Sequence, residues 1–158
     1  MSSAPRSVVA TAIGTWFGAG FLPAPGTAGS AAAIAIAAAL FYWLGVCQLG
    51  IGLMAAGLFL PGVWASTTVA RERNLKDPQI VVVDEVLGQW VTLAAAVTLN
   101  WKSFLAAFVL FRLFDIWKPY PIRKLEKLPE GWGVVMDDIL AGVYGAVVLR
   151  LLGWWNLV

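Results

Sequence analysis

The segment IVVVDEVLGQWVTLAAAVTL, residues 80–99, combines a long apolar run with two acidic residues near its start. Its small residues follow the first acid at intervals of four: Asp84, then Gly88, Thr92 and Ala96. Positions four apart lie on one face of an α-helix, and in a membrane a face of small residues lets two helix backbones approach closely. The segment therefore predicts a helix that packs tightly against a partner and brings an aspartate to that contact.

Residues 134–155 form an apolar segment that offers a matching face. Here too an aspartate begins a series of small residues spaced by four: Asp138, Gly142 and Ala146. If the two faces pack together, the carboxylates of Asp84 and Asp138 come together with them. The neighbouring acids, Glu85 and Asp137, are turned away by about 100° on an ideal helix. We expect them to lie on the outside of the same cluster.

The composition indicates an integral membrane protein. Hydrophobic residues make up 60% of the 158 residues and charged residues only 13%, against about 25% charged in ordinary soluble domains. No charged residue occurs from Ser7 to Ala70. We predict one all-α domain over residues 1–158, a compact helical bundle embedded in a membrane.

Crossing the hydrocarbon core takes about 20 residues. The sequence predicts about five spanning helices, the fourth of them short, together with a short N-terminal helix over residues 7–17 and a Gly/Pro-rich loop over residues 14–30. The five apolar segments are 30–48, 49–70, 80–99, 103–117 and 134–155.

Basic residues fall mainly on one side of this predicted topology, and such an excess marks the cytoplasmic side. The opposite side has only Lys102 and, towards the end of the last segment, Arg150. The predicted cytoplasmic side carries Arg6, Arg71, Arg73, Lys76, Lys118, Arg123, Lys124 and Lys127.

A further acid lies in VLFRLFDIWKPYPIRK, residues 109–124, where Arg112 and Asp115 are three positions apart and share a helix face. Charges in an apolar helix are costly unless they are paired or functional. In the predicted topology all five acids lie near the cytoplasmic side, and a cluster of carboxylates is a site for Mg²⁺ or Mn²⁺. We predict Asp84, Asp115 and Asp138 as the inner ring, and the full metal-ligating set is Asp84, Glu85, Asp115, Asp137 and Asp138.

The segment GTWFGAGFLPAPGTAGS, residues 14–30, leads directly into an apolar helix on the same side as the acids. A glycine-rich turn before a helix N-terminus is the geometry of an anion site, and Thr27 and Ser30 add hydroxyl donors. The spacing fits neither the P-loop nor the dinucleotide fingerprint. With the cations Arg112, Lys118 and Arg123, the pattern indicates phosphoryl chemistry at a membrane face.

Several kinds of chemistry are excluded or disfavoured. The chain has no histidine and one cysteine, Cys47, so a phosphohistidine is excluded and a phosphocysteine is disfavoured. The net charge of +2 is too small to indicate nucleic-acid binding. A water activated by metal is the simplest nucleophile, and an aspartyl-phosphate intermediate is the alternative.

Four motifs in order, GAGFLPAPGTAGS, DEVLGQW, FRLFDIWKPYPI and MDDILAG, resemble the phosphatidylglycerophosphatase A family from about residue 12 to residue 146. This resemblance implies a bacterial Mg²⁺-dependent lipid phosphatase, which converts phosphatidylglycerophosphate to phosphatidylglycerol. With the topology predicted above, it would be a multi-pass protein of the cytoplasmic (inner) membrane with its active site facing the cytoplasm. The family pattern is matched at Asp84, Glu85, Arg112, Asp115, Lys118, Pro119, Asp137 and Asp138, and in the first motif at Pro25, Gly26, Thr27, Gly29 and Ser30.

In the leading hypothesis the acids hold the metal, one carboxylate helps to deprotonate water, and the phosphate is bound by Arg112, Lys118, Arg123 and the residue 25–30 loop. Two alternatives come from other classes. A cation- or proton-coupled transporter predicts acids near the bilayer midplane and a broken helix in place of the Gly/Pro segment. A lipid phosphotransferase also uses aspartate-rich metal sites, but the spaced aspartates of the alcohol-phosphotransferase signature are missing.

Overall fold

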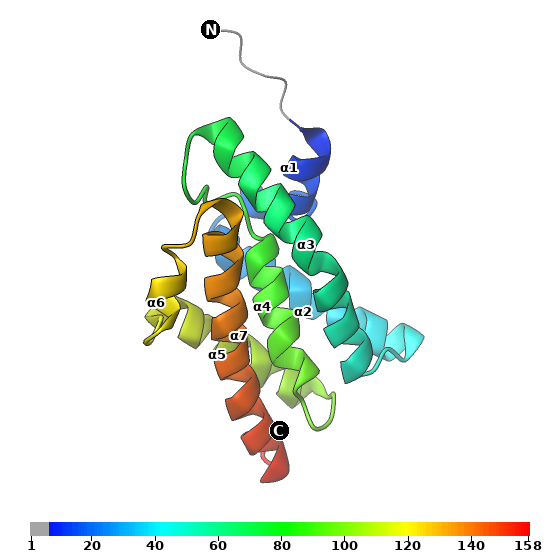
Figure 1. The fold of residues 1–158 in the computed structure, drawn as a ribbon. Helices are drawn as coiled ribbons and strands as arrows, with labels where there is room; N and C mark the ends of the chain where they lie inside the picture. The colour runs from blue at the N-terminus through cyan, green and yellow to red at the C-terminus, as the bar shows by residue number, and fades with distance from the viewer. Residues whose placement is uncertain (1–6) are drawn as a thin grey trace, which may run out of the picture.

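Residues 7–158 are described by a computed structural model, and within this range every regular element is a helix (Figure 1). The predicted all-α class is confirmed. Arg6, counted above among the cytoplasmic cations, lies outside the described residues. The elements are α1 (Val8–Gly14), a short 3₁₀ helix η1 (Ala19–Phe21), α2 (Pro25–Leu44), α3 (Gln48–Arg73), α4 (Val83–Ala94), α5 (Trp101–Trp117), α6 (Ile122–Leu125) and α7 (Glu130–Trp154).

Helix α4 is the centre of the bundle, and its most extensive partner is α7 (Figure 1). The two backbones touch where a side chain would not fit. A Cβ atom on Gly142 would lie 2.4 Å from the carbonyl oxygen of Gly88, and one on Gly88 would lie 2.5 Å from that of Asp138. The predicted contact between the two small-residue faces is therefore confirmed.

Local signals set the ends of the helices around the acidic residues. Asn100 caps α5 by accepting hydrogen bonds from the amides of Lys102 (2.8 Å) and Ser103 (3.1 Å). The helix ends at Lys118, which has left-handed backbone angles (φ 47°), and Pro119 follows it. Helix α2 begins with Pro25 in its first turn, where the fixed φ of proline suits a helix. The predicted loop over residues 14–30 is thus too long, because its last six residues are helical.

Only α2 and α3, among the described residues, are both long and apolar enough to cross a membrane. They correspond to the predicted segments 30–48 and 49–70, and the prediction of five spans is not confirmed. The segment 80–99 contains α4, which has 12 residues, most of them buried in protein, and is about 18 Å long. An apolar sequence buried by neighbouring helices has the same composition as one that faces lipid, and this is why the prediction exceeded what the structure supports.

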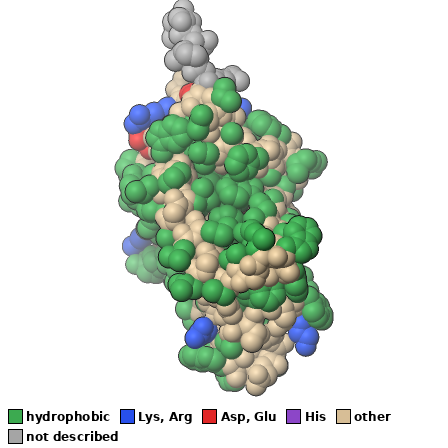
Figure 2. All heavy atoms as spheres, turned by 90° about the vertical axis from the view of Figure 1, so that its right-hand side faces the viewer, with side chains coloured by type: hydrophobic (Ala, Val, Ile, Leu, Met, Phe, Trp, Pro, Cys, Tyr) green, Lys and Arg blue, Asp and Glu red, His purple; other side chains and the backbone are tan. Residues whose placement is uncertain are grey.

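The outer faces of α2 and α3 form a broad hydrophobic surface. Figure 2 views the molecule from the side on which these helices lie in Figure 1, and hydrophobic side chains are spread over much of it, with the few charged ones at its margins. Large apolar side chains such as Trp43, Leu53 and Leu60 are more than half exposed. A soluble monomer rarely exposes so large an apolar patch, so this face agrees with membrane association.

Candidate active site

A cavity of about 330 Å³ opens at the end of the bundle where α2, α4 and α7 begin and α5 ends. Four segments distant in sequence meet there, and ten of the lining side chains are polar or charged. We call this cavity the acid pocket. It is lined by Ala24, Pro25, Gly26, Thr27, Asp77, Gln79, Val81, Asp84, Glu85, Arg112, Asp115, Lys118, Val134, Asp137 and Asp138.

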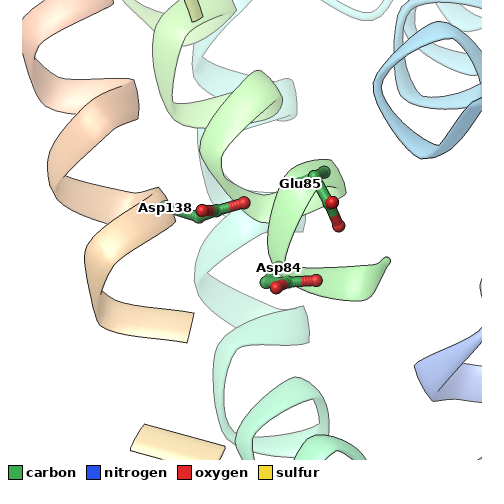
Figure 3. Close-up of side chains that lie close together, drawn as sticks. All are labelled: Asp84, Glu85 and Asp138. Carbon is green, nitrogen blue, oxygen red and sulfur yellow. The ribbon is translucent and has the colours of Figure 1, made fainter. Parts of the chain in front are cut away.

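Three carboxylates meet in the pocket: Asp84, Glu85 and Asp138 each place an oxygen within 4.8 Å of the others. Figure 3 shows Asp138 reaching from α7 towards the first turn of α4, where the other two lie. The close backbone contact between Gly88 and Gly142, one turn further along, holds the two helices at this distance. Glu85 thus belongs to the innermost trio, in the place that the sequence predicted for Asp115.

Buried oxygens in this cluster have no hydrogen-bond partner within residues 7–158. Asp84 and Asp138 are 7% and 4% exposed, and the four unpaired atoms are Asp84 Oδ1, Glu85 Oε2, Asp137 Oδ1 and Asp138 Oδ2. Burying unpaired carboxylate oxygens beside one another is costly, because both desolvation and like-charge repulsion oppose it. A cation placed among them would remove both costs. The donor set consists only of oxygen atoms, and it therefore fits Mg²⁺ or Mn²⁺.

Arg112 provides positive charge in the pocket lining. Its Nη1 donates to Oδ2 of Asp115 at 2.5 Å, so the two residues share a face of α5 as predicted and form an ion pair there. The N-terminus of α2 lies against the same group. A Cβ on Gly26 would lie 2.5 Å from Glu85 Oε1 and 3.1 Å from Arg112 Nη1. A guanidinium, a carboxylate and the first amides of α2 therefore lie around one space.

Lys118 lines the acid pocket and is paired there with two carboxylates. Its Nζ donates to Asp137 Oδ2 at 2.6 Å and to Glu126 Oε1 at 2.8 Å. Burial alone would lower the pKa of Lys118, but these two hydrogen bonds outweigh it and raise the pKa above its ordinary value. The residue lines the pocket and also ties the end of α5 to α7, and Asp137 is turned towards it.

Asp77 is a pocket residue that the sequence analysis missed. It lies at the rim, in the connection between α3 and α4, and partial burial there raises the pKa of its carboxyl, while the positive charge of Lys118 opposes the shift. In the sequence Asp77 belongs to RERNLKDP, residues 71–78, a pattern that is typical of an ordinary charged loop. The signal that could have identified it is its place directly before the segment that carries Asp84.

Three of the predicted phosphate contacts do not line the acid pocket. Gly29 packs against Val82, where a Cβ would lie 2.7 Å from the Cβ of that valine. Ser30 is fully buried and donates its hydroxyl to the carbonyl oxygen of Gly26 at 2.9 Å. Arg123 donates to the carbonyl oxygen of Trp117 at 3.3 Å and lines another cavity. The predicted contacts that do line the pocket are Pro25, Gly26, Thr27, Arg112 and Lys118.

The fold and the site together define an all-α protein with a buried carboxylate cluster that faces a guanidinium and a helix N-terminus at one end of the bundle. The family model for phosphatidylglycerophosphatase A matches residues 12–153. The chain belongs to this family, and the resemblance seen in the four motifs is confirmed.

Known proteins similar to the chain come from several bacteria. Phosphatidylglycerophosphatase A of Haemophilus influenzae is 41% identical over 143 residues, which cover 89% of this chain and 86% of that protein. Its Escherichia coli K12 counterpart is 38% identical over 142 residues, covering 87% and 79%. A Bacteroides thetaiotaomicron protein, provisionally named a phosphatidylinositol-3-phosphatase, is 43% identical over 148 residues, covering 90% and 92%. No solved structure shows a significant match.

Proposed function

We propose that this chain is a lipid phosphatase that hydrolyses the terminal phosphomonoester of phosphatidylglycerophosphate to give phosphatidylglycerol and phosphate. The observation that carries the proposal is the acid pocket, in which three carboxylate oxygens lie within 4.8 Å of one another beside Arg112 and the start of α2. Membership of the family, and two relatives named for this activity, support the choice of substrate.

Asp84, Glu85 and Asp138 would hold Mg²⁺ or Mn²⁺, with Asp115 and Asp137 beside them. The support for a metal is the set of unpaired buried oxygens in this cluster. When bound, the metal would offset the charge of the carboxylates and of the phosphate that approaches them. Asp115 is paired with Arg112 and Asp137 with Lys118, so we assign these two acids to orienting the cations.

Arg112 and the free amides of Gly26 and Thr27 would bind the phosphate oxygens. The first amides of a helix have no partner within it, and the positive end of the α2 dipole favours an anion. The guanidinium and these amides stabilise the negative charge that grows on the phosphoryl oxygens during transfer. Water attacks phosphorus as the ester P–O bond breaks. A pocket carboxylate takes the proton from the water and passes it to the departing glycerol oxygen.

We place the protein in the bacterial cytoplasmic membrane as a multi-pass protein, with α2 and α3 crossing and the pocket open to the cytoplasm. Support comes from the hydrophobic face of these helices and from the distribution of basic residues. Arg71 and Arg73 lie at the end of α3 that adjoins the start of α4. Lys102 and Arg150 lie at the start of α5 and near the end of α7, at the other end of the bundle.

The position of the acids favours a phosphatase over a transporter. Asp84 and Glu85 lie in the first turn of α4, and Asp115 lies in the last turn of α5. Asp138 joins them from the first half of α7. The carboxylates therefore gather at one end of the bundle, whereas a transporter would place them near the midplane with access to both sides.

A second substrate of the same chemical kind is phosphatidylinositol 3-phosphate. It is favoured by the provisional name of the Bacteroides relative, and it too presents a phosphomonoester on a lipid head group. Because both lipids present a phosphomonoester to the acid pocket, the experiment below includes both.

The test measures phosphate release from both lipids by the purified chain in detergent, with Mg²⁺, with Mn²⁺ and with a chelator. We expect metal-dependent release by wild type and a loss of at least about a thousandfold in kcat in Asp138→Asn. Mn²⁺ binding, followed by electron paramagnetic resonance without substrate, should weaken in the same variant. Lys127→Ala, an exposed change outside the pocket, is the control and should behave like wild type. Folded wild type that releases no phosphate from either lipid with either metal would refute the proposal.

A further inference from the structure

A second cavity, of about 450 Å³, opens beside the acid pocket at the end of α5, and Lys118 lines both. Unlike the acid pocket, it has no carboxylate among its lining residues. We call it the basic cavity, and its lining residues are Trp117, Lys118, Pro119, Tyr120, Pro121, Arg123 and Lys124.

The two outer cations of the basic cavity are tethered in place without being neutralised. Arg123 Nη2 donates to the carbonyl oxygen of Trp117 at 3.3 Å, and Lys124 Nζ donates to the hydroxyl of Tyr120 at 3.2 Å, above a ring whose centroid is 4.7 Å away. Tyr144 in turn donates its hydroxyl to the carbonyl oxygen of Tyr120 at 3.0 Å. Neither Arg123 nor Lys124 forms an ion pair within residues 7–158, so the cavity keeps a net positive charge.

A stripe of exposed apolar side chains on α5 leads to this cavity. Its members are spaced by four, so they lie on one helix face, and each is more than half exposed: Trp101, Leu105, Val109 and Leu113. Exposed apolar residues continue the stripe at the cavity itself with Ile116, Trp117 and Tyr120. The 17 residues of α5 extend over about 25 Å. Cations and aromatic rings at the end of an apolar stripe are typical of a lipid-binding surface.

We propose that the basic cavity binds the phosphodiester of an anionic phospholipid whose acyl chains lie along the α5 stripe. A phosphodiester carries one negative charge between apolar chains and a polar head group, and the surface offers two free cations between an apolar stripe and a polar pocket. Because the basic cavity has no carboxylates to hold a metal, an anion bound there is not placed for hydrolysis. This inference rests on the proposed function: the terminal phosphate of the same lipid enters the acid pocket next to it.

Binding can be tested without catalysis, because phosphatidylglycerol has the phosphodiester and acyl chains and no terminal phosphate. Native mass spectrometry would compare retention of phosphatidylglycerol with that of zwitterionic phosphatidylcholine by the purified chain. The double variant Arg123→Ala, Lys124→Ala should lose at least about tenfold of the preference for the anionic lipid. The matched control Arg73→Ala, Lys127→Ala removes two positive charges outside the cavity at the same end of the bundle. Its preference for the anionic lipid should stay within about twofold of that of wild type. Equal losses in both variants, or none in either, would overturn the proposal.

A kinetic comparison tests the same site during turnover. The two substrates are phosphatidylglycerophosphate and glycerol 3-phosphate, which has the phosphomonoester but neither the diester nor the acyl chains. The ratio of kcat/KM on the lipid to kcat/KM on glycerol 3-phosphate should fall at least about tenfold in the double variant, mainly through KM. An equal loss on both substrates would mean a structural effect and would contradict the proposal. If wild type hydrolyses neither substrate, the proposed function fails, and the lipid-binding experiment still decides this inference.

Discussion

The contact between α4 and α7 has two halves that differ in how their polar groups are satisfied. Near the start of α4, Asp84 and Asp138 face each other with oxygens that have no hydrogen-bond partner in the described chain. One and two turns further, Gly88 and Gly142 are in backbone contact, and Thr92 Oγ1 lies 3.0 Å from the carbonyl oxygens of both glycines. We call the first part the polar half, because its carboxylate oxygens lack hydrogen-bond partners. We call the second part the closed half, because the two backbones touch there and the Thr92 hydroxyl is hydrogen-bonded.

The difference shows how a costly site is kept in place. Repelling carboxylates would move apart if the helices that carry them were free to separate. The closed half fixes the distance between the helices, so the carboxylates stay together and remain ready for a cation. A site is preorganised for its ligand when well-packed surroundings hold the ligand-binding side chains in place. Of the variants below, Gly142→Leu and Thr92→Val change the closed half and Asp84→Asn changes the polar half. Asp115→Asn and Asp77→Asn change acids that lie beside this contact in the acid pocket.

The largest effect is expected for Gly142→Leu in the closed half. A Cβ at this position would lie 2.4 Å from a backbone oxygen of α4, and a backbone cannot move aside as a flexible side chain can. We expect the free energy of unfolding to fall by more than about 3 kcal/mol, measured by thermal or denaturant unfolding in detergent. Gly57→Leu on α3 is the matched control, because a Cβ there meets nothing within 4 Å. Similar losses in both variants would show that the helix contact is not the cause.

Asp84 in the polar half is unpaired, whereas Asp115 beside it on α5 is paired with Arg112, and their asparagine variants should change stability in opposite directions. Asp84→Asn removes a buried charge that has no partner, so without metal the free energy of unfolding should rise by about 1 kcal/mol or more. Asp115→Asn leaves Arg112 without its carboxylate and should lower the free energy of unfolding by about 1–3 kcal/mol. Thermal unfolding with a chelator measures both changes. A fall in Asp84→Asn would contradict the idea that the cluster is strained without a cation.

A smaller effect is expected for Thr92→Val, which keeps the shape of the side chain and removes its hydroxyl. The hydroxyl is fully buried and lies between two helix carbonyls, so its loss should cost about 1 kcal/mol. Thr68→Val is the control, since Thr68 donates only to the carbonyl oxygen four residues earlier in its own helix. Chemical denaturation of the two variants should show a loss in the first and little change in the second. Equal values would mean that the contact with α7 adds nothing.

Helical periodicity was enough to predict the closed half of this contact. Gly88 and Thr92 are four positions apart, as are Asp138 and Gly142, so each pair marks one face of a helix. In an apolar protein, a face of small residues is typically a close contact between two helices. The same period predicted the pair Arg112 and Asp115. Hydropathy, by contrast, records only that a segment is apolar. It therefore counted α4 as a span, although this helix is surrounded by protein.

The finer arrangement of the site depends on distances that no local pattern encodes. Lys118 reaches Glu126 and Asp137, 8 and 19 positions away, and that choice depends on how α6 and α7 fold back on α5. The glycine-rich segment predicted an anion site, but it did not show that the helix starts at Pro25. This start puts Gly29 and Ser30 one turn too deep to reach the pocket. Asp77 comes to the rim only through the path of the connection between α3 and α4.

The smallest effect is expected at that rim, for Asp77→Asn. The pKa of Asp77 is raised, with partial burial as the main cause, so in the range between its ordinary value of about 4 and its raised value the folded protein binds this proton more tightly than the unfolded chain. Because the pKa of this carboxyl is raised, the stability that its bound proton contributes is present below about pH 4 and is lost as the pH rises through the folded-state value.

Asp77→Asn should therefore have a slightly higher melting temperature than wild type at pH 7 and the same melting temperature below about pH 4. Melting temperatures of both proteins from pH 3.5 to pH 8, with a chelator present, measure this difference, and the other acids cancel because they titrate in both proteins. A difference that does not change with pH would show that Asp77 acts through its contacts and not through its charge. The charge repulsion inferred for the pocket would then not extend to its rim.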